Sequence, residues 1–344
     1  MLNNRVVLIT GGTGSLGKKL VQIIVREYKP EKLIIFSRDE LKQFEMSQKW
    51  GINNYPFIRY FLGDVRDKDR LTRAFNKVDY VIHAAALKQV PAAEYNPCEF
   101  IKTNVMGAMN VIDAAINNRV KKVIALSTDK ACNPINLYGA TKLCSDKLFI
   151  AANVYSGFNN TRFAVARYGN VLGSRGSVVP FFKEKAKTGI LPITDKEMTR
   201  FWITLDQAAH FVINTLKHLK GGEIFIPKVS SMKIADLAKA MAPKCKQQIV
   251  GIRPGEKIHE TLISRAEGRS TIEFKDCFIV YPAAHKVRAS RAMSRKGRLC
   301  PDSFEYNSNT NTRWLSVNDL GKMVKQISED YTIEKSRWSM EDVP

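Results

Sequence analysis

The chain has 344 residues, 44% hydrophobic and 9% aromatic, and this length predicts one large domain or two closely joined domains. The net charge of +21 does not indicate nucleic-acid binding, because the basic residues are spread along the whole chain without interleaved aromatic residues. We therefore expect no nucleic-acid partner, and binding of an anionic nucleotide explains the charge better.

Secretion and membrane insertion are not expected either. The N-terminus leads directly into a strand-like segment and lacks the layout of a signal peptide. No run of about 18 apolar residues is present that could span a membrane. The six cysteines are scattered without a Cys-x-x-Cys pair, which predicts reduced thiols, no metal site and a cytoplasmic protein.

The first predicted strand, residues 5–10, runs directly into a glycine-rich turn and a predicted helix at residues 18–27. The turn has a Gly-x-x-Gly-x-x-Gly motif, in which glycine permits a tight turn and lets backbone amides approach a pyrophosphate at the helix N-terminus. A strand before such a motif and a helix after it predict a dinucleotide site. Its residues are Gly11, Thr13, Gly14, Ser15, Leu16 and Gly17.

The end of the second predicted strand, residues 32–36, bears on the choice of dinucleotide. An acidic residue there binds the ribose of NAD, whereas an arginine accommodates the 2′-phosphate of NADP. Ser37 and Arg38 therefore indicate NADP, and Lys42 is assigned to the same site. Asp39 is better explained as the N-cap of the next helix than as a ribose ligand.

The third and fourth predicted strands, residues 58–62 and 79–83, extend the cofactor site. Asp64 follows the third strand at a position where it could meet an adenine amino group. Small residues follow the fourth strand, and they let a cofactor lie against the backbone. The residues assigned here are Asp64, Val65, Ala84, Ala85, Ala86 and, on a predicted helix at residues 97–117, Asn104.

The fifth predicted strand, residues 121–126, leads into the stretch that carries the candidate chemistry. Tyr138 and Lys142 stand four residues apart where a helix begins, so both side chains lie on one face. An ammonium beside a phenol favours the phenolate, which can accept a proton from a substrate alcohol. This spacing alone is common on solvated helices, but here it follows a nucleotide motif and a polar triplet.

That triplet lies at the carboxyl end of the strand, where open α/β sheets bind their ligands. We therefore predict that a hydroxyl, an acid, a phenol and two amines converge on one catalytic site. Its residues are Thr128, Asp129, Lys130, Tyr138 and Lys142, of which the last two also contact the cofactor.

The alternation of strands and helices continues with a sixth strand at residues 161–166 and predicts an α/β fold. We expect a Rossmann-like, doubly wound parallel sheet with a smaller C-terminal substrate-binding region. Residues 1–172, with about 199–222, are predicted to form the nucleotide-binding domain. Residues 173–198 and 223–344 are predicted to form the substrate-binding region, interleaved with the first domain.

Candidate substrate residues lie mainly in this later part of the chain. Arg200 and Arg253 are candidate phosphate clamps, because a guanidinium fork matches phosphate oxygens, although an ordinary surface charge explains each more simply. The substrate residues are assigned as Lys88, Asn170, Ser177, Val178, Arg200, Arg253 and Glu256. Residues 283–300 contain six Lys or Arg and no acid, which predicts a mobile or solvent-facing loop.

With these motifs in place, the chain resembles the extended short-chain dehydrogenase/reductases. Its stretch Ser-Thr-Asp-Lys-Ala-Cys-Asn-Pro-Ile-Asn-Leu-Tyr-Gly-Ala-Thr-Lys is similar to the inverting UDP-N-acetylglucosamine 4,6-dehydratases, as is Arg-Pro-Gly-Glu-Lys-x-His-Glu. That family includes soluble bacterial enzymes that begin pseudaminic acid synthesis for flagellin and surface glycans. Its membrane-bound members carry Met in place of the tyrosine, whereas Tyr138 is present here. The resemblance covers about residues 5–282 and resumes near Phe304.

The resemblance implies a UDP-N-acetylglucosamine substrate, a tightly bound NADP that is regenerated in each cycle, and a homo-oligomer, often a hexamer. In the implied mechanism, Tyr138 and Lys142 remove the C4 hydroxyl proton while NADP⁺ takes the C4 hydride. The resulting ketone acidifies C5, water leaves from C5 and C6, the hydride returns to C6, and protonation inverts C5.

The resemblance and the side-chain chemistry together suggest how the proton transfers are divided. Lys130 is the candidate base for C5, because an amine desolvated among apolar and cationic neighbours has a lowered pKa. Asp129 is the candidate acid for the departing C6 hydroxyl, a role that requires a raised pKa. Thr128 would hydrogen-bond the sugar or the ketone oxygen. The sequence does not decide how Asp129 and Lys130 share these steps.

Two other functions are compatible with the same fold. A nucleotide-sugar C4- or C5-epimerase shares the oxidation step, but the Asp-Lys pair after Thr128 argues against it, because a dehydration needs an acid for the leaving hydroxyl. A non-catalytic dinucleotide sensor would keep the fold without the chemistry, and the presence of Tyr138 and Lys142 argues against that alternative.

Overall fold

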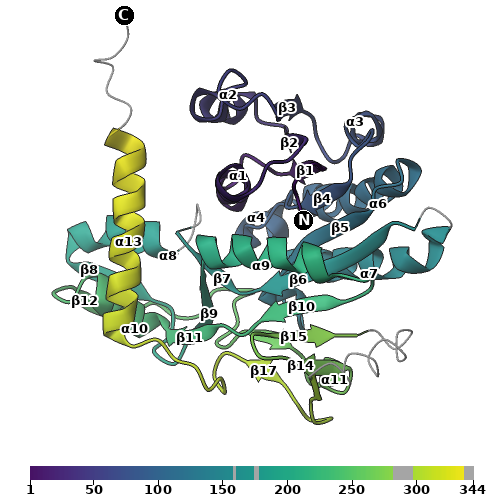
Figure 1. Cartoon of the computed structure of the whole chain (residues 1–344). Helices are drawn as coiled ribbons and strands as arrows, with labels where there is room; N and C mark the ends of the chain where they lie inside the picture. The colour runs from purple at the N-terminus through teal and green to yellow at the C-terminus, as the bar shows by residue number, and fades with distance from the viewer. Residues whose placement is uncertain (158–159, 174–177, 282–296, 337–344) are drawn as a thin grey trace, which may run out of the picture.

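A computed structural model describes residues 1–157, 160–173, 178–281 and 297–336. Within these residues, the chain forms one large mixed sheet flanked by helices, with smaller sheets beside it (Figure 1). The predicted α/β fold with a doubly wound parallel sheet is confirmed. Ser177 and most of the basic segment 283–300 lie outside the described residues.

Seven strands of the large sheet run parallel, in the order β3-β2-β1-β4-β5-β6-β10. They are β1 (Val6–Thr10), β2 (Lys32–Ser37), β3 (Ile58–Leu62), β4 (Tyr80–His83), β5 (Lys122–Thr128), β6 (Arg162–Tyr168) and β10 (Ile224–Pro227). The inner strands are almost fully buried runs of Val, Ile, Leu and Ala, as parallel strands covered on both faces must be. The strand order reverses between β1 and β4, and open α/β sheets bind ligands at the carboxyl ends beside such a point.

Three antiparallel strands extend this sheet beyond β10: β15 (Cys277–Val280), β14 (Thr271–Glu273) and β16 (Arg298–Leu299). β10 pairs with β6 on one side and with β15 on the other. The C-terminal part of the chain is thereby joined to the parallel sheet, and the predicted division into two interleaved regions stays a prediction.

Helices pack side by side along the sheet. α1 (Ser15–Glu27) lies against α9 (Leu205–His218), and α6 (Gly107–Asn117) lies against both α3 (Lys68–Ala74) and α7 (Leu137–Tyr155). The remaining helix near β2 is α2 (Glu40–Lys49), whose N-cap is Asp39. Its carboxylate accepts a hydrogen bond from the Lys42 backbone amide, so the predicted capping role is confirmed.

The predicted helix over residues 97–117 contains a change of pitch. It begins as α5 (Pro97–Phe100), passes through a π-helical turn at Ile101–Met106 and continues as α6. The turn carries the buried Asn104, which donates to the Leu87 carbonyl at 2.9 Å and to the Thr141 hydroxyl at 3.0 Å. Because π-turns often occur at functional sites, the irregular pitch fits a helix that supports the loop after β4.

A second apolar core lies beside the large sheet. Its strands are β7 (Asn170–Leu172), β9 (Thr199–Thr204) and β11 (Ser230–Lys233) in one sheet, and β8 (Ile190–Ile193) and β12 (Lys246–Ile249) in another. Its helices are α8 (Val178–Lys185), α10 (Ile234–Met241) and α13 (Val317–Ser336), with a 3-10 turn at Ala186–Thr188. Leu320 and Val324 bury α13 against this core, and Figure 1 shows α13 standing alongside α10.

Short elements complete the described chain. They are α4 (Val90–Tyr95), the 3-10 turn η2 (Asp129–Ala131), α11 (Arg265–Gly268), and the pair β13 (Thr261–Ile263) and β17 (Tyr306–Asn307).

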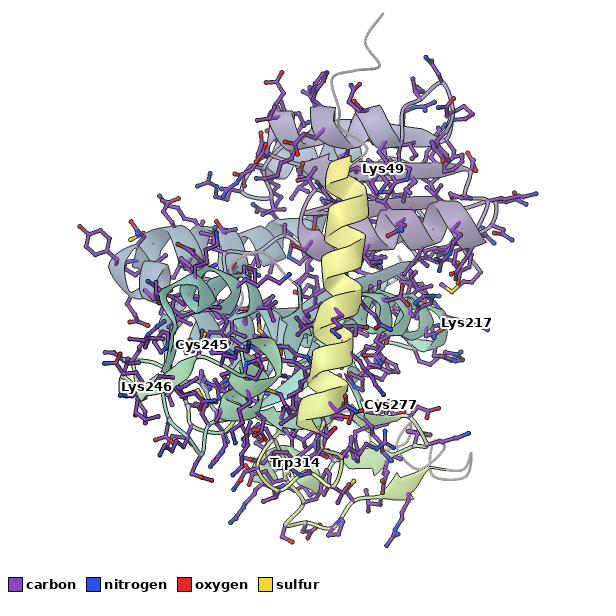
Figure 2. All side chains as sticks on the ribbon, turned by 90° about the vertical axis from the view of Figure 1, so that its left-hand side faces the viewer. Lys49, Lys217, Cys245, Lys246, Cys277 and Trp314 are labelled. Atoms are coloured by element: carbon purple, nitrogen blue, oxygen red, sulfur yellow. The ribbon has the colours of Figure 1, made fainter. Side chains whose placement is uncertain are left out.

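Basic side chains are distributed over separate parts of the surface. Figure 2 shows Lys49, Lys217 and Lys246 at widely spaced positions on one face of the molecule. This distribution agrees with the sequence, in which no single segment of the described chain accounts for the charge of +21. Of the helices that the structure describes, none is long and apolar enough to cross a bilayer.

A buried ion network fastens the C-terminal part to the parallel sheet. Arg167 on β6 is fully buried and donates to both carboxylate oxygens of Glu267 at 3.0 Å and to Asp146 at 3.3 Å. It also donates to the Leu262 carbonyl at 3.1 Å, and Asp146 accepts a further bond from Ser127 at 2.8 Å. One guanidinium thus links β6 with α7 and α11.

Replacing this arginine tests the network. Arg167→Met leaves the buried Asp146 and the half-buried Glu267 without this counter-ion, and we expect it to lower the free energy of unfolding by about 3–5 kcal/mol. Arg265→Met is the control, because Arg265 is 80% exposed and its surface pair with Glu305 at 3.6 Å is worth less than about 1 kcal/mol. Equal urea midpoints for the two variants would contradict the assigned role.

Candidate active site

The glycine-rich turn lies between β1 and α1, at the switch point of the sheet. Gly11 has a φ of +65°, and a Cβ there would lie 2.8 Å from the Ala85 backbone nitrogen. A Cβ on Gly17 would overlap the Gly12 carbonyl. The N-cap of α1 is Gly14, which provides no side-chain cap for the first amides of the helix. The turn therefore presents backbone amides to a bound anion, which fits the diphosphate of a dinucleotide.

The ends of β2 and β3 bring Arg38 and Asp64 together, with Arg38 Nη1 3.7 Å from Asp64 Oδ2. Arg66 donates to the same carboxylate oxygen at 2.8 Å and 3.0 Å. Burial acts to raise the pKa of Asp64, but the hydrogen bonds and charges of Arg66 and Arg38 lower it overall. Asp64 is thereby kept as a carboxylate, the form that could accept a bond from an adenine amino group. Lys42 pairs with its own helix cap, Asp39.

The end of β4 contains a polar contact that the sequence does not indicate. The Thr10 hydroxyl lies 2.8 Å from the buried His83 Nδ1 and accepts a bond from the Ala85 amide at 3.3 Å. Burial, helped by the charge of Lys142, lowers the pKa of His83 to about 3. His83 is therefore neutral, and with Thr10 it fixes the backbone after β4, where Ala84, Ala85 and Ala86 follow.

The structure shows the surroundings of two assigned residues, Asn104 and Lys88, whose ligand roles stay predictions. Asn104 is assigned to the cofactor. Its side-chain oxygen accepts a hydrogen bond from the Leu87 backbone amide at 2.9 Å, and its side-chain nitrogen donates to the Leu87 carbonyl and to the Thr141 hydroxyl. It therefore positions the loop after β4 on α7. Lys88, assigned to the substrate, is exposed in that same loop.

α7 carries Tyr138 and Lys142, and its first turn lies against η2. Asn136 caps the helix by accepting from the Gly139 amide at 2.7 Å. Gly139 is required because a Cβ there would overlap the Lys130 carbonyl, so the helix start lies directly against η2. The side chain of Lys142 is buried, and this burial lowers its pKa, while Asp146 acts in the opposite direction.

The electrostatic environment of Tyr138 differs from the prediction. Burial raises the pKa of Tyr138 to about 12, and the charge of Lys130 and a hydrogen bond with the Thr128 hydroxyl act against this rise. Lys130 is therefore a cation that favours the phenolate and that the sequence does not pair with Tyr138, while the role predicted for Lys142 stays a prediction. Thr128, Lys130 and Tyr138 thus lie together as predicted, and the structure places Tyr138 next to both the Lys130 ammonium and the Thr128 hydroxyl.

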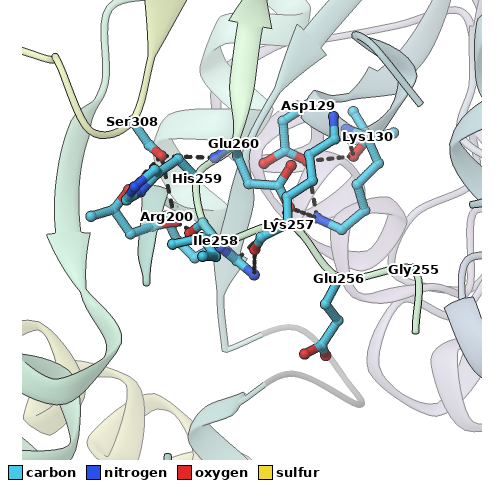
Figure 3. Close-up of polar contacts among 12 residues, drawn as sticks. Asp129, Lys130, Arg200, Gly255, Glu256, Lys257, Ile258, His259, Glu260 and Ser308 are labelled. Atoms are coloured by element: carbon cyan, nitrogen blue, oxygen red, sulfur yellow. Dashed lines mark hydrogen bonds and ion pairs between the residues drawn. The ribbon is translucent and has the colours of Figure 1, made fainter. Parts of the chain in front are cut away.

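At the centre of the site, Lys130 bridges two buried carboxylates (Figure 3). Its Nζ lies 3.1 Å from Asp129 Oδ1 and 3.0 Å from Glu260 Oε1. Asp129 also accepts from the Thr128 hydroxyl at 2.9 Å. Glu260 is the functional residue that sequence reasoning missed. The available signal was its position as the last residue of the Arg-Pro-Gly-Glu-Lys-x-His-Glu motif, but nothing in the sequence places it beside Lys130.

These contacts bear on the pKa shifts that the sequence predicts for Lys130 and Asp129. The prediction of a lowered pKa for Lys130 is wrong: burial acts in that direction, but Asp129 and Glu260 raise the pKa above its ordinary value. The raised pKa predicted for Asp129 is confirmed, and its causes are burial first and the charge of Glu260 second. The acid expected of this pair is therefore Asp129, while Lys130 is held as an ammonium.

Arg200, which is predicted as a phosphate clamp, donates to backbone carbonyls of the chain itself. Its buried guanidinium donates to the carbonyls of Thr199 at 2.7 Å, Ile258 at 3.0 Å and Lys257 at 2.9 Å. The arginine therefore holds the loop that contains Glu260. Arg253 is exposed, with its Nη1 3.9 Å from Glu256 Oε1.

Of the other predicted substrate residues, Asn170 adjoins the site through its neighbour Gly169, where a Cβ would lie 3.3 Å from Asp129 Oδ2. Asn170 Oδ1 and Glu256 Oε2 are buried without a hydrogen-bond partner among the described residues. The Glu256 side chain points away from Lys130 (Figure 3), and Val178 is the first residue of α8.

Comparison with known proteins gives the family. Residues 7–282 match the family described as polysaccharide biosynthesis protein. The chain belongs to this family. It is 55% identical to the UDP-N-acetylglucosamine 4,6-dehydratase (inverting) of Campylobacter jejuni, over 94% of this chain and 98% of that protein. It is also 42% identical to a UDP-glucose 4-epimerase of Rickettsia felis, over 97% of this chain and 99% of that protein.

Solved structures agree with this placement. The X-ray structure of Pen from Bacillus thuringiensis superimposes with a TM-score of 0.85 and 36% identity, covering 94% of this chain and 99% of that one. DesIV, a dTDP-glucose 4,6-dehydratase from Streptomyces venezuelae, shares the fold with a TM-score of 0.64 and 21% identity over 73% of this chain and 86% of that one. The resemblance to the inverting 4,6-dehydratases that the motifs suggest is confirmed.

Proposed function

We propose that this protein is an inverting UDP-N-acetylglucosamine 4,6-dehydratase, a hydro-lyase that makes UDP-2-acetamido-2,6-dideoxy-β-L-arabino-hexos-4-ulose. The observation that carries the proposal is the pairing of Asp129, whose pKa is raised, with Lys130 at 3.1 Å, beside Tyr138. Elimination of water from C5 and C6 needs an acid and a base close together, and this pair supplies both.

The first step is removal of the C4 hydroxyl proton by Tyr138, with Lys142 behind it on α7. The phenol is an effective base only as phenolate, and the ammonium of Lys130 and the Thr128 hydroxyl both favour that form. The resulting 4-ketone makes the neighbouring C5 proton acidic. Thr128 is positioned to hydrogen-bond the sugar oxygen.

The second step requires a proton transfer within the Lys130–Asp129 pair, because Lys130 starts as an ammonium. A shift of one proton across their hydrogen bond gives a neutral amine and a carboxylic acid, and the raised pKa of Asp129 lowers the free-energy cost of this shift. The amine then takes the C5 proton while Asp129 protonates the leaving C6 hydroxyl. Both groups regain their starting charges, and C5 receives a solvent-derived proton on the opposite face.

The proposed cofactor is NADP, bound tightly at the glycine-rich turn, with Ser37, Arg38 and Lys42 near the 2′-phosphate. When bound, it accepts the C4 hydride and returns it to C6. The exposed Arg38 and the absence of an acid immediately after Ser37 support NADP over NAD. Because the hydride returns in every cycle, no added cofactor is consumed.

Gly17→Ala tests the cofactor site. Its Cβ would overlap the Gly12 carbonyl, so the turn must shift, and we expect the purified variant to retain less than about a tenth of the wild-type bound nucleotide. The nucleotide released by denaturation is quantified and identified by mass. Gly321→Ala is the control, because no heavy atom lies within 4 Å of its added Cβ. Wild-type nucleotide content in Gly17→Ala would refute the assigned site.

The UDP-sugar is proposed to lie at the carboxyl ends of the parallel strands, beside Asp129, Lys130 and Tyr138. Its contacts are assigned to Lys88, Asn170, Ser177, Val178, Arg253 and Glu256. The unpartnered buried oxygens of Asn170 and Glu256 support this, since buried acceptors without donors are expected to be satisfied by a ligand or by water. The proposed setting is a cytoplasmic homo-oligomer that supplies pseudaminic acid synthesis.

The activity is tested by incubating the purified protein with UDP-N-acetylglucosamine in deuterium oxide, without added nicotinamide, and reading the product by NMR. The proposal predicts a 4-keto-6-deoxy sugar with deuterium at C5 and the L-arabino configuration. An epimerised sugar that keeps its C6 hydroxyl would assign the epimerase function, which the Rickettsia relatives make the second candidate. No turnover, even with NADP⁺ and UDP-glucose supplied, would favour a dinucleotide sensor.

A further inference from the structure

Glu260 enters the site from a different part of the chain than the other charged groups. It lies 130 positions beyond Lys130 in the sequence, on the loop that ends at β13, and it is buried. Its backbone amide donates a hydrogen bond to the Ser308 hydroxyl at 2.9 Å, and this bond fixes the position of the loop. Figure 3 shows its side chain directed at Lys130, on the side away from the loop carbonyls that Arg200 holds.

The charged groups that face Glu260 keep it ionised. Lys130 lies at 3.0 Å from Oε1, and Arg200 Nε lies at 3.8 Å from the same oxygen. Burial acts to raise the pKa of Glu260, but Lys130, Arg200 and Lys257 together lower it below its ordinary value. Glu260 is therefore the carboxylate of the pair that does not accept a proton.

Asp129 has the opposite environment. The groups that face Asp129 are Thr128, Lys130, Tyr138 and Glu260. Among the charged groups that shift its pKa, the cation is Lys130. Its Oδ2 is buried and has no hydrogen-bond partner within the described part of the chain. Oε2 of Glu260 is likewise buried without a partner in the described part of the chain, so what distinguishes the two carboxylates that flank Lys130 is Arg200, which lies beside Glu260.

We infer that Glu260 is a positioning residue for the water elimination: it holds Lys130 together with Asp129 and directs the proton of Lys130 onto Asp129. The inference rests on the proposed function and deepens it. The proton moves from Lys130 Nζ to Asp129 Oδ1, the negative charge stays on Glu260, and Arg200 balances that charge. The net charge of the four groups is unchanged, so the transfer creates no uncompensated buried charge.

Glu260→Gln tests this inference, because the amide keeps the size and the hydrogen-bond acceptor for Lys130 while removing the charge. Asp129 acts only when protonated, so kcat falls as the pH rises through the macroscopic pKa of the cluster. Without the charge of Glu260 that pKa is lower, and the fall moves to lower pH by about one unit or more. We expect kcat at pH 8 to drop at least about tenfold, with KM for UDP-N-acetylglucosamine changed less than about threefold.

Two further readouts distinguish positioning from a merely structural role. The elimination follows the C4 oxidation, so Glu260→Gln should accumulate reduced nicotinamide absorbance during turnover, and Glu260→Asp should restore part of the rate and of the wild-type pH profile. Glu197→Gln is the matched control, since Glu197 is 71% exposed and pairs with Lys233 on the surface. It should behave as wild type.

A wild-type pH profile in Glu260→Gln would overturn the inference, as would a loss of activity accompanied by a lower melting temperature and no accumulation of reduced nicotinamide. If the wild-type enzyme is active, either result for Glu260→Gln refutes only the role of Glu260, and the proposed dehydratase function is unaffected. Failure of the wild-type protein to eliminate water would refute the proposed function itself, and the inference with it.

Discussion

Replacing Asp129 by asparagine is expected to stop water elimination while leaving the first oxidation in place. Asparagine keeps the shape and can accept from Thr128 and Lys130, but it has no proton to give to the C6 hydroxyl. Loss of a general acid costs about 10²–10⁴-fold in kcat, and we expect a value in this range. The measurement is steady-state product formation together with the absorbance of reduced nicotinamide, which should build up to the enzyme concentration.

The control for this experiment is Asp69→Asn, which removes an exposed carboxylate in the first turn of α3 and should leave kcat unchanged. An Asp129→Asn enzyme that releases 4-keto-6-deoxy product at the wild-type rate would show that another group protonates the leaving hydroxyl. The role assigned to the Lys130–Asp129 pair would then be wrong.

Tyr138→Phe is expected to block the reaction one step earlier. The ring remains and only the hydroxyl is lost, so the C4 proton has no acceptor and kcat should fall by about 10²–10⁴-fold. Neither reduced nicotinamide nor product should appear, in contrast to Asp129→Asn. Calorimetric titration with UDP-N-acetylglucosamine should still give an affinity close to that of the wild type.

Tyr155→Phe provides a matched control at the other end of the same helix, because Tyr155 is 57% exposed at the C-terminus of α7. It should retain full activity. If Tyr138→Phe still formed reduced nicotinamide at the wild-type rate, a different base would have to remove the C4 proton, and Lys130 would be the nearest alternative.

The parts of the fold and site that the sequence predicts are those encoded by short segments. The turn between β1 and α1 needs glycine where a Cβ would meet the backbone, and that requirement is visible in the spacing of Gly11, Gly14 and Gly17. Tyr138 and Lys142 share one turn of helix, and Asp39 precedes a helix that needs a cap. For Gly14, Gly17 and Asp39 the contacting group lies within a few residues, so local chemistry is sufficient, whereas Gly11 also meets the backbone of Ala84 and Ala85 after β4.

The predictions that differ from the structure depend on partners far away in the chain. Burial alone would lower the pKa of Lys130, but the charges of the adjacent Asp129 and of Glu260 raise it above its ordinary value. Glu260 is the distant partner, which β13 and its preceding loop bring to within 3.0 Å. Arg200 is predicted as a surface or ligand-binding charge, but the carbonyls that fix it belong to residues near 258. Long-range pairing of this kind has no periodic signature in a single sequence.

The measurement that tests the central claim most directly uses UDP-N-acetylglucosamine labelled with deuterium at C4. In a dehydratase the C4 hydride is returned within the same active site to C6, so the account predicts that the deuterium appears in the C6 methyl group of the 4-keto product. Mass and NMR spectra of the product locate the label. Deuterium retained at C4 of a sugar that still bears its C6 hydroxyl would contradict the account and identify an epimerase.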